Sequence, residues 1–257
     1  MLSRLSLTVA LAATVLFPAI VPAGAAAASP VFTIDGNVGL QSFVSLTDAH
    51  VRATLDALVI FSESPAVRSG SWTAIQAAFP SAMRGNVPDA TYLYARPNGS
   101  YWVAGKGLQP VSIADRAYFK EAISGKNAVG DVVLSRSVGN VVAVVAVPVR
   151  DANGKIVGIV GAGIDLAKLT AILTQEMGIG SSAVFWAVDA NGITALHSDP
   201  ANIFNNALKV PELKNALQHM IATDSGTQTY AFKGKTRTVL YRHSPLTGWT
   251  YGFGIVH

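Results

Sequence analysis

Arg116 is the residue whose surroundings point most directly to a specific chemistry. It stands in the run Asp115-Arg116-Ala117-Tyr118-Phe119, at the start of a segment, residues 115–124, that is typical of a short helix. A guanidinium offers a rigid fork of N–H donors that matches a carboxylate, and a helix N-terminus favours an anion. Tyr118 and Phe119 could then line the pocket, and Tyr118 could also donate a hydrogen bond.

The same residues allow a plainer interpretation. Arg116 could pair on the surface with Asp115 or Glu121, and the two aromatic residues could simply belong to the core. In either case we expect Asp115 to cap the helix, because aspartate accepts hydrogen bonds from the free N–H groups of a first turn. Gly125 follows the expected end of the helix.

Asp165 is the second candidate for ligand chemistry. It follows residues 156–164, an apolar run typical of a buried strand, where an unpaired carboxylate would be costly. Its charge therefore needs either a cationic group on a ligand or the N–H groups of a helix expected to begin at Leu166. The residues alone leave both alternatives open.

No arrangement of residues indicates catalysis, a metal or a cofactor. The five histidines have no His-Glu-x-x-His spacing, no Gly-x-Ser-x-Gly motif occurs, and the chain has no cysteine. The glycines between Gly158 and Gly163 lie in an expected strand and lack the Lys-Ser/Thr ending of a phosphate loop. His197 and Asp199 share a turn but are too few for a metal site. We therefore expect a protein that is not an enzyme.

Composition and charge narrow the class further. Half of the 257 residues are hydrophobic, 13% are charged and the formal net charge is +4. This balance argues against disorder. Proteins that bind nucleic acid gather Lys and Arg on one face, whereas here the basic residues are scattered. The nearest cluster, Lys233, Lys235 and Arg237, is interpreted as a solvated hairpin, so nucleic acid is not an expected partner.

The N-terminus resembles a secretory signal peptide over residues 1–28. Arg4 is followed by an apolar stretch from Leu5 to Val21 and by the small residues Ala23-Gly24-Ala25. We expect cleavage and a periplasmic or secreted protein. The alternative is that the segment stays as an anchor.

Hydrophobic periodicity predicts one long helix and two groups of strands. Apolar residues between Asp35 and Ser62 recur at three-, four- and seven-residue spacings, so the segment 30–62 is expected to be mainly helical, with Asp35 or Asn37 as its N-cap. Short helices are expected after Ser64 and from Ser71 to Phe79. Strands are expected at 91–95, 101–104, 129–134, 141–149 and 156–164, then a helix at 166–177.

The strand and helix order repeats in the second half. Strands are expected at 183–188, 193–197, 227–232, 237–241 and 249–256, with a helix at 213–221. Tight turns such as Asp151-Ala152-Asn153-Gly154 indicate antiparallel pairing. The fold class is therefore α+β: a long N-terminal helix followed by two antiparallel-sheet lobes.

Three stretches carry a resemblance to a known family. They are residues 115–122; residues 134–166, which include Val157-Gly158-Ile159-Val160-Gly161; and the smaller lobe's Val188-Asp189-Ala190-Asn191-Gly192, His197-Ser198-Asp199-Pro200 and Leu246-Thr247-Gly248-Trp249. In order and spacing they resemble the double Cache family of extracytoplasmic sensor domains. The resemblance implies two PAS-like lobes: a membrane-distal one at 63–180 that holds the ligand, and a smaller membrane-proximal one at 181–257 that usually holds none. No exit helix follows the last strand, so we expect a stand-alone module.

The resemblance also assigns roles to residues. In amino-acid-binding members, the counterparts of Arg116 and Asp165 hold the carboxylate and the amine of a zwitterion. Tyr92, Tyr94 and Trp102, on the first hairpin, could line the side-chain end of the pocket, although alternation along the strand leaves room for at least one to be core.

One departure weakens the match to an amino-acid site. Such members tend to carry a Tyr and an Asp where this chain has Val133 and Ser135. We therefore expect an exported ligand-binding protein for a small carboxylate, most simply an amino acid, that passes its signal to a membrane sensor or transporter. The alternatives are a small organic acid, or an interaction module with a vestigial pocket that forms a homodimer through the N-terminal helix.

Overall fold

The computed structural model describes residues 35–82, 90–178 and 183–256, and residues 34–257 form one compact unit. The predicted signal peptide at 1–28 lies outside the described residues, as do the first residues of the segment 30–62. None of the described helices is both long and apolar enough to span a membrane.

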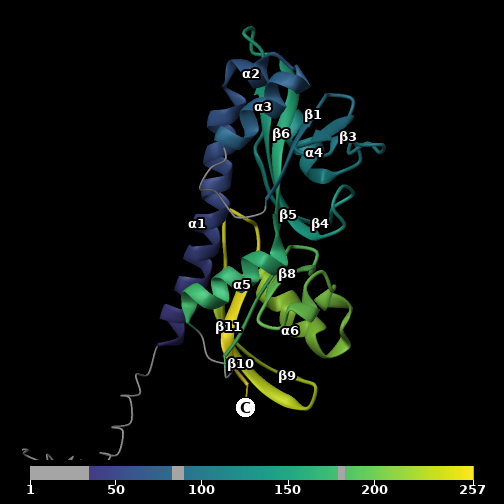
Figure 1. Ribbon diagram of the computed structural model, residues 1–257. Coiled ribbons are helices and arrows are strands. Elements are labelled where there is room, and N and C mark those ends of the chain that lie inside the picture. Colours follow the sequence, from purple (N-terminus) through teal and green to yellow (C-terminus); the bar gives the residue numbers. More distant parts are fainter. Residues whose placement is uncertain (1–34, 83–89, 179–182, 257) are drawn as a thin grey trace, which may run out of the picture. The chain divides into compact units, whose positions relative to one another are not determined.

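A single long helix, α1 (Gly36–Ser62), opens the described fold (Figure 1). Its predicted cap is confirmed, because the Asp35 carboxylate accepts a hydrogen bond of 2.7 Å from the backbone N–H of Asn37. The apolar residues form one buried face, as their spacing requires. The Phe43 ring on this face lies 4.9 Å from the ring of Phe185 and 5.1 Å from that of Tyr251. α1 therefore contributes to the core of the second sheet as well as to that of the first.

Two short helices follow α1. The first, α2 (Pro65–Arg68), begins directly after Ser64, as predicted, and Ser64 caps it by accepting a hydrogen bond from the backbone N–H of Val67. The next helix, α3 (Trp72–Ala82), begins directly after Ser71 and runs past its predicted end at Phe79. These helices cover one face of the first sheet.

The first sheet has six antiparallel strands in the order β3-β2-β1-β6-β5-β4. They are β1 (Thr91–Ala95), β2 (Tyr101–Val103), β3 (Gly107–Leu108), β4 (Ala128–Leu134), β5 (Val141–Arg150) and β6 (Ile156–Asp165). All except the two-residue β3 were predicted. As their continuous apolar sequences indicate, β5 and β6 are buried on both faces.

The two faces of the first sheet pack against different helices. On β6, Val160 and Ile164 belong to the core that the sheet shares with α1 and with α5 (Leu166–Met177). Ile159 faces the other way, into the core under α4 (Ala117–Ile123). Gly161 and Gly163 lie on the same face as Ile159. They leave the α4 side of the sheet without bulky side chains at the point where a cavity forms.

The second sheet has five antiparallel strands in the order β8-β7-β11-β10-β9. They are β7 (Ala183–Val188), β8 (Thr194–His197), β9 (Ser225–Phe232), β10 (Lys235–His243) and β11 (Thr250–Val256). Helix α6 (Pro211–Ala222) packs against it, and two 3-10 turns, η1 (Pro200–Asn202) and η2 (Ala207–Lys209), lie between β8 and α6. The predicted α+β class with an N-terminal helix and two antiparallel sheets is confirmed.

A buried hydrogen bond joins the two sheets. The indole N–H of Trp249, which is 1% exposed, donates to the carbonyl oxygen of Gly130 at 2.8 Å. Gly130 interrupts the register of β4 between Val129 and Asp131, and its φ of 95° lies in the region that favours glycine. This bulge directs a β4 carbonyl towards the turn before β11.

Candidate ligand-binding site

A small cavity lies between α4 and the first sheet, where the resemblance places a ligand. Its volume is about 30 Å³, which is room for about one water molecule. Its walls come from β1, β2, β4, β5, β6 and the start of α4. The lining residues are Thr91, Leu93, Tyr101, Ile113, Arg116, Tyr118, Val133, Leu134, Ser135, Arg136, Ser137, Val142, Val144 and Gly163.

Arg116 lies in the wall of this cavity and is the N-cap residue of α4, where its side chain makes no capping bond. The half-buried guanidinium donates a hydrogen bond of 3.0 Å to the carbonyl oxygen of Leu134. Within the described residues no carboxylate forms an ion pair with Arg116. The guanidinium therefore keeps donors available for an anion.

The prediction that Asp115 caps the helix is wrong. The helix begins two residues later, at Ala117, and the Asp115 carboxylate instead meets Arg136, with N···O distances of 2.7 and 2.6 Å. This bidentate contact with Arg136 lowers the pKa of Asp115 to about 2. The Asp115 carboxylate thus bonds to a side chain 21 residues further along the chain and not to the backbone N–H groups of α4. The pair joins the segment before α4 to the loop after β4, on two sides of the cavity.

Tyr118 lines the cavity, whereas Phe119 does not. Burial raises the pKa of the Tyr118 hydroxyl, which keeps it a neutral hydrogen-bond donor or acceptor. Phe119 is 3% exposed and packs in the core between α4 and the sheet. Tyr101, which the sequence did not single out, supplies a further hydroxyl-bearing wall.

Ser135 lies in the wall, as expected, together with Val133. The Ser135 hydroxyl oxygen is 3.2 Å from that of Ser137. These residues give the β4 side of the cavity neutral polar groups and an aliphatic surface, with no carboxylate among them.

Asp165 is the N-cap of α5. One of its carboxylate oxygens accepts hydrogen bonds from the backbone N–H groups of Ala167 and Lys168, at 3.0 and 3.1 Å. The other accepts a bond of 2.7 Å from the side-chain amide of Asn140. Asp165 is 8% exposed and does not line the cavity, although it lies on the same face of β6 as Gly163. Of the two alternatives left open for Asp165, the contacts in the structure are those of a helix cap.

Tyr92, Tyr94 and Trp102 are not brought to the cavity, which corrects the expectation that they line it. They lie on the opposite face of the first sheet, in the core shared with α1 and α3. The Trp102 ring lies 6.2 Å from that of Trp72, and the Tyr92 ring 5.7 Å from that of Phe79. The physical reason is alternation: residues 91, 93 and 101 face α4, so their neighbours must face away.

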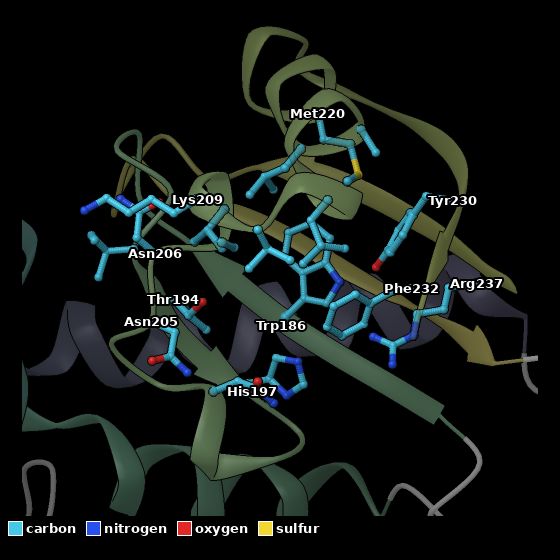
Figure 2. Close-up of a pocket in the computed structure, with 18 of the residues that line it drawn as sticks. Trp186, Thr194, His197, Asn205, Asn206, Lys209, Met220, Tyr230, Phe232 and Arg237 are labelled. Atoms are coloured by element: carbon cyan, nitrogen blue, oxygen red, sulfur yellow. The ribbon is translucent and has the colours of Figure 1, made fainter. Parts of the chain in front are cut away.

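A second and larger cavity, of about 570 Å³, lies in the second sheet's half of the chain (Figure 2). Sequence reasoning missed it. It assigned Arg237 to a solvated hairpin with Lys233 and Lys235, but Arg237 lines this cavity. Alternation could have indicated this, because Arg237 shares a face of β10 with the buried residues Val239 and Tyr241.

His197, in the wall of the second cavity, is expected to make folding sensitive to acid. Burial lowers its pKa from 6.5 to about 4, against the opposing attraction of Asp199. The unfolded chain therefore binds more protons than the folded chain between pH 6.5 and 4, and stability falls as pH decreases through this window. We expect a loss of about 2–3 kcal/mol by pH 4.5, measured by urea unfolding.

Two variants isolate the contribution of His197. In the wild-type protein the backbone N–H of Asp199 donates to Nδ1 of His197 at 2.8 Å. His197→Asn retains an acceptor for this bond but cannot take up a proton, so it should flatten the pH dependence of stability. His219→Asn, on α6, should leave it unchanged. An equal slope in wild type and His197→Asn would contradict the assignment.

The structure thus combines a long helix, two antiparallel sheets, and a cavity under a short helix whose lining includes Arg116 and Arg136. The chain belongs to the Cache domain family, because the double Cache family model matches residues 40–256. No curated protein sequence matches the chain significantly. Within the described residues, no three His, Cys, Asp or Glu side chains are grouped to hold a metal ion.

Solved structures share the fold at low sequence identity. The ligand-binding domain of the Pseudomonas aeruginosa PAO1 amino acid chemoreceptor PctB, in complex with L-Arg, has a TM-score of 0.65 and 16% identity, over 86% of this chain and 94% of that one. The ligand-binding domain of the Pseudomonas fluorescens chemoreceptor CtaA, with L-serine, has a TM-score of 0.64 and 18% identity, over 85% and 94%. An extracellular ligand binding receptor from Desulfohalobium retbaense has a TM-score of 0.70 and 14% identity, over 86% and 40%.

Proposed function

We propose that this chain is an exported, soluble binding protein of the sensor type, which holds the carboxylate of a small metabolite at Arg116. The observation that carries the proposal is the state of that guanidinium. It is half-buried in a cavity wall, it donates to a carbonyl oxygen, and within the described residues no carboxylate forms an ion pair with it, although Asp115 and Asp131 are near enough to interact electrostatically. A bidentate carboxylate would satisfy its remaining donors.

An amino acid is the first candidate ligand. Structural relatives are chemoreceptor domains in complex with L-Arg and L-serine, and Asp165 lies on the cavity face of β6. To accept an amine, Asp165 would use the oxygen that now accepts from Asn140, either beside that bond or in exchange for it. The cavity must also widen, because about 30 Å³ is too small for an amino acid. The Asp115–Arg136 ion pair, which joins two sides of the cavity, is exposed and so costs little to open.

A plain carboxylic acid is the second candidate, and one observation favours it. Both carboxylate oxygens of Asp165 already have partners, and the β4 wall presents Val133 and Ser135 without a second carboxylate. A ligand without an amine would leave the Asp165 contacts intact. Arg116 would serve either ligand.

Replacing Arg116 should abolish ligand binding. Amino acids and their deaminated counterparts, such as alanine and propionate, are screened by thermal shift, and those that stabilise the protein are titrated calorimetrically. We expect at least one class to stabilise the wild-type protein and Arg116→Ala to lose the effect. Lys120→Ala, on the exposed face of α4, is the matched control and should retain it. Stabilisation that survives Arg116→Ala would remove the proposed site, and the absence of any stabilising ligand would count against the function.

Asn140→Ala should separate the two candidates. The substitution frees one oxygen of Asp165, which otherwise accepts the 2.7 Å bond from Asn140, and leaves the helix cap in place. If the ligand carries an amine, its affinity should rise while that of the deaminated counterpart stays constant. If the amino acid and its deaminated counterpart bind with equal affinity, both in Asn140→Ala and in the wild-type protein, the site is one for plain carboxylates.

Export, partner and assembly are parts of the same proposal. Mass spectrometry of the mature N-terminus tests cleavage after residue 28 or nearby, and a retained N-terminus would favour the anchor.

The bound form would pass its signal to a membrane sensor or transporter. Dimerisation through α1, which exposes Ile60 by 73%, is tested by light scattering with and without ligand.

A further inference from the structure

The second cavity lies between the second sheet and α6. It is lined by side chains of β7, β8, β9 and β10, of the connection through η1 and η2, and of α6. Its volume of about 570 Å³ lies within the range of sites for small organic molecules. It is almost twenty times larger than the cavity at Arg116.

Large apolar side chains make up most of the wall. Trp186 and Val188 come from β7, Leu217 and Met220 from α6, and Phe232 from β9. Figure 2 shows the Trp186 indole between Met220 and His197. The body of a ligand in this cavity would therefore contact hydrocarbon and aromatic rings, and its burial would supply the main driving force.

The charged groups in the wall are all basic. Arg237 and Lys209 line the cavity, and the lining residues include no aspartate or glutamate. His197 is neutral near pH 7 because burial lowers its pKa to about 4. In Figure 2, Arg237 lies beside Phe232 and Tyr230, across the cavity from Lys209. The electrostatic environment thus suits an anion and repels a cation.

Arg237 has unused capacity for a ligand. Its Nε–H is buried without a hydrogen-bond partner. The Tyr230 hydroxyl interacts with the guanidinium, but within the described residues no carboxylate forms an ion pair with it. The group stacks on the Phe232 ring, at 4.7 Å from its centroid. A buried donor without an acceptor is costly, and a carboxylate is the acceptor that matches the guanidinium fork.

The cavity edge also holds a residue in an unfavourable conformation. Phe204, between η1 and η2, has a φ of 70°, which is rare for a bulky side chain. Its backbone N–H donates to the carbonyl oxygen of Thr194 at 2.8 Å, and its ring is 38% exposed at the edge. Strained backbone of this kind collects at ligand-holding loops.

From these observations we propose that the second cavity is a binding site for a small amphipathic carboxylic acid. The carboxylate lies at Arg237 and the aromatic or alkyl body lies against Trp186 and the apolar face of α6. This site is independent of Arg116 and takes a larger and more apolar acid, because the Arg116 cavity is small and presents hydroxyl groups.

Trp186 provides a direct readout. Phenylacetate and hexanoate are titrated into the full-length protein and followed by tryptophan fluorescence and calorimetry, with phenylacetamide and hexanamide as neutral counterparts. We expect the acids to saturate the signal and to bind roughly tenfold or more tightly than the amides. Trp186→Phe should remove the fluorescence change.

Four variants make the test decisive. Arg237→Gln should weaken the binding of the acids by roughly tenfold or more and leave that of the amides unchanged. Lys235→Gln, at an exposed position on the same strand, should change the affinity for neither. Met220→Trp, which adds bulk to the apolar wall, should weaken the binding of acids and amides alike. Arg116→Ala should leave the binding of both acids in the second cavity unchanged. A negative result for this cavity can therefore be told apart from a negative result for the Arg116 site. Equal acid affinity in wild type and Arg237→Gln, or no saturable binding of either acid, would overturn the proposal.

Discussion

Gly130→Ala should destabilise the protein by roughly 3 kcal/mol or more. Two causes add at this position. The φ of 95° is strained for any residue with a side chain, and an added Cβ would overlap the backbone carbonyl oxygen of Thr247. Backbone cannot rotate out of the way as a flexible side chain can, so β4 or the turn before β11 would have to move.

Gly139→Ala is the matched control for this effect. Gly139 has a similar φ of 78°, but an added Cβ there meets no atom within 4 Å. We expect it to cost only about 1–2 kcal/mol, from the backbone conformation alone. Urea unfolding of both variants gives the difference, which measures the contact between β4 and Thr247. Equal losses would show that this contact is not tight.

Trp249→Ala should cost about 3–5 kcal/mol, and Trp249→Phe about 1–3 kcal/mol. The alanine variant loses a buried aromatic ring that is 1% exposed. The phenylalanine variant keeps most of the apolar volume but leaves the Gly130 carbonyl, now bonded at 2.8 Å, without its donor. The two variants therefore separate packing from the hydrogen bond.

Trp72→Phe serves as the control for the tryptophan substitution. Trp72, the first residue of α3, is partly buried in the core and stacks on Trp102 of β2 with ring centroids 6.2 Å apart. Its replacement should cost less than that of Trp249, as measured by the same urea titrations. A larger loss for Trp72→Phe than for Trp249→Phe would contradict the importance of the bond to Gly130.

Features that depend on local chemistry could be predicted from the sequence. The cap at Asp35 and the course of α1 follow from residue types within a few positions of one another. The hairpin of β1 and β2 follows from Pro97-Asn98-Gly99 between two runs rich in aromatic residues. The two-sheet fold follows from the sum of such local signals.

Features that depend on residues far apart in the sequence could not be predicted in this way. Asp115 is a good N-cap residue, yet Arg136 offers two charge-assisted bonds that a cap does not match. Alternation separates Tyr92 from residues 91 and 93 but does not say which face meets α4. Arg237 was grouped with its charged neighbours, although the alternation of β10 places it with Val239.

The placement of α1 has a consequence for how the two cavities can be observed. One continuous core contains Leu58 and Phe43 of α1, Ile164 of the first sheet, and Phe185 and Tyr251 of the second. Neither sheet can lose its structure without exposing apolar surface of the other, so residues 34–257 should melt in a single cooperative transition. By mass action, a ligand in either cavity stabilises the whole unit. Ligands of both, added together, should raise its free energy of unfolding by the sum of their separate effects.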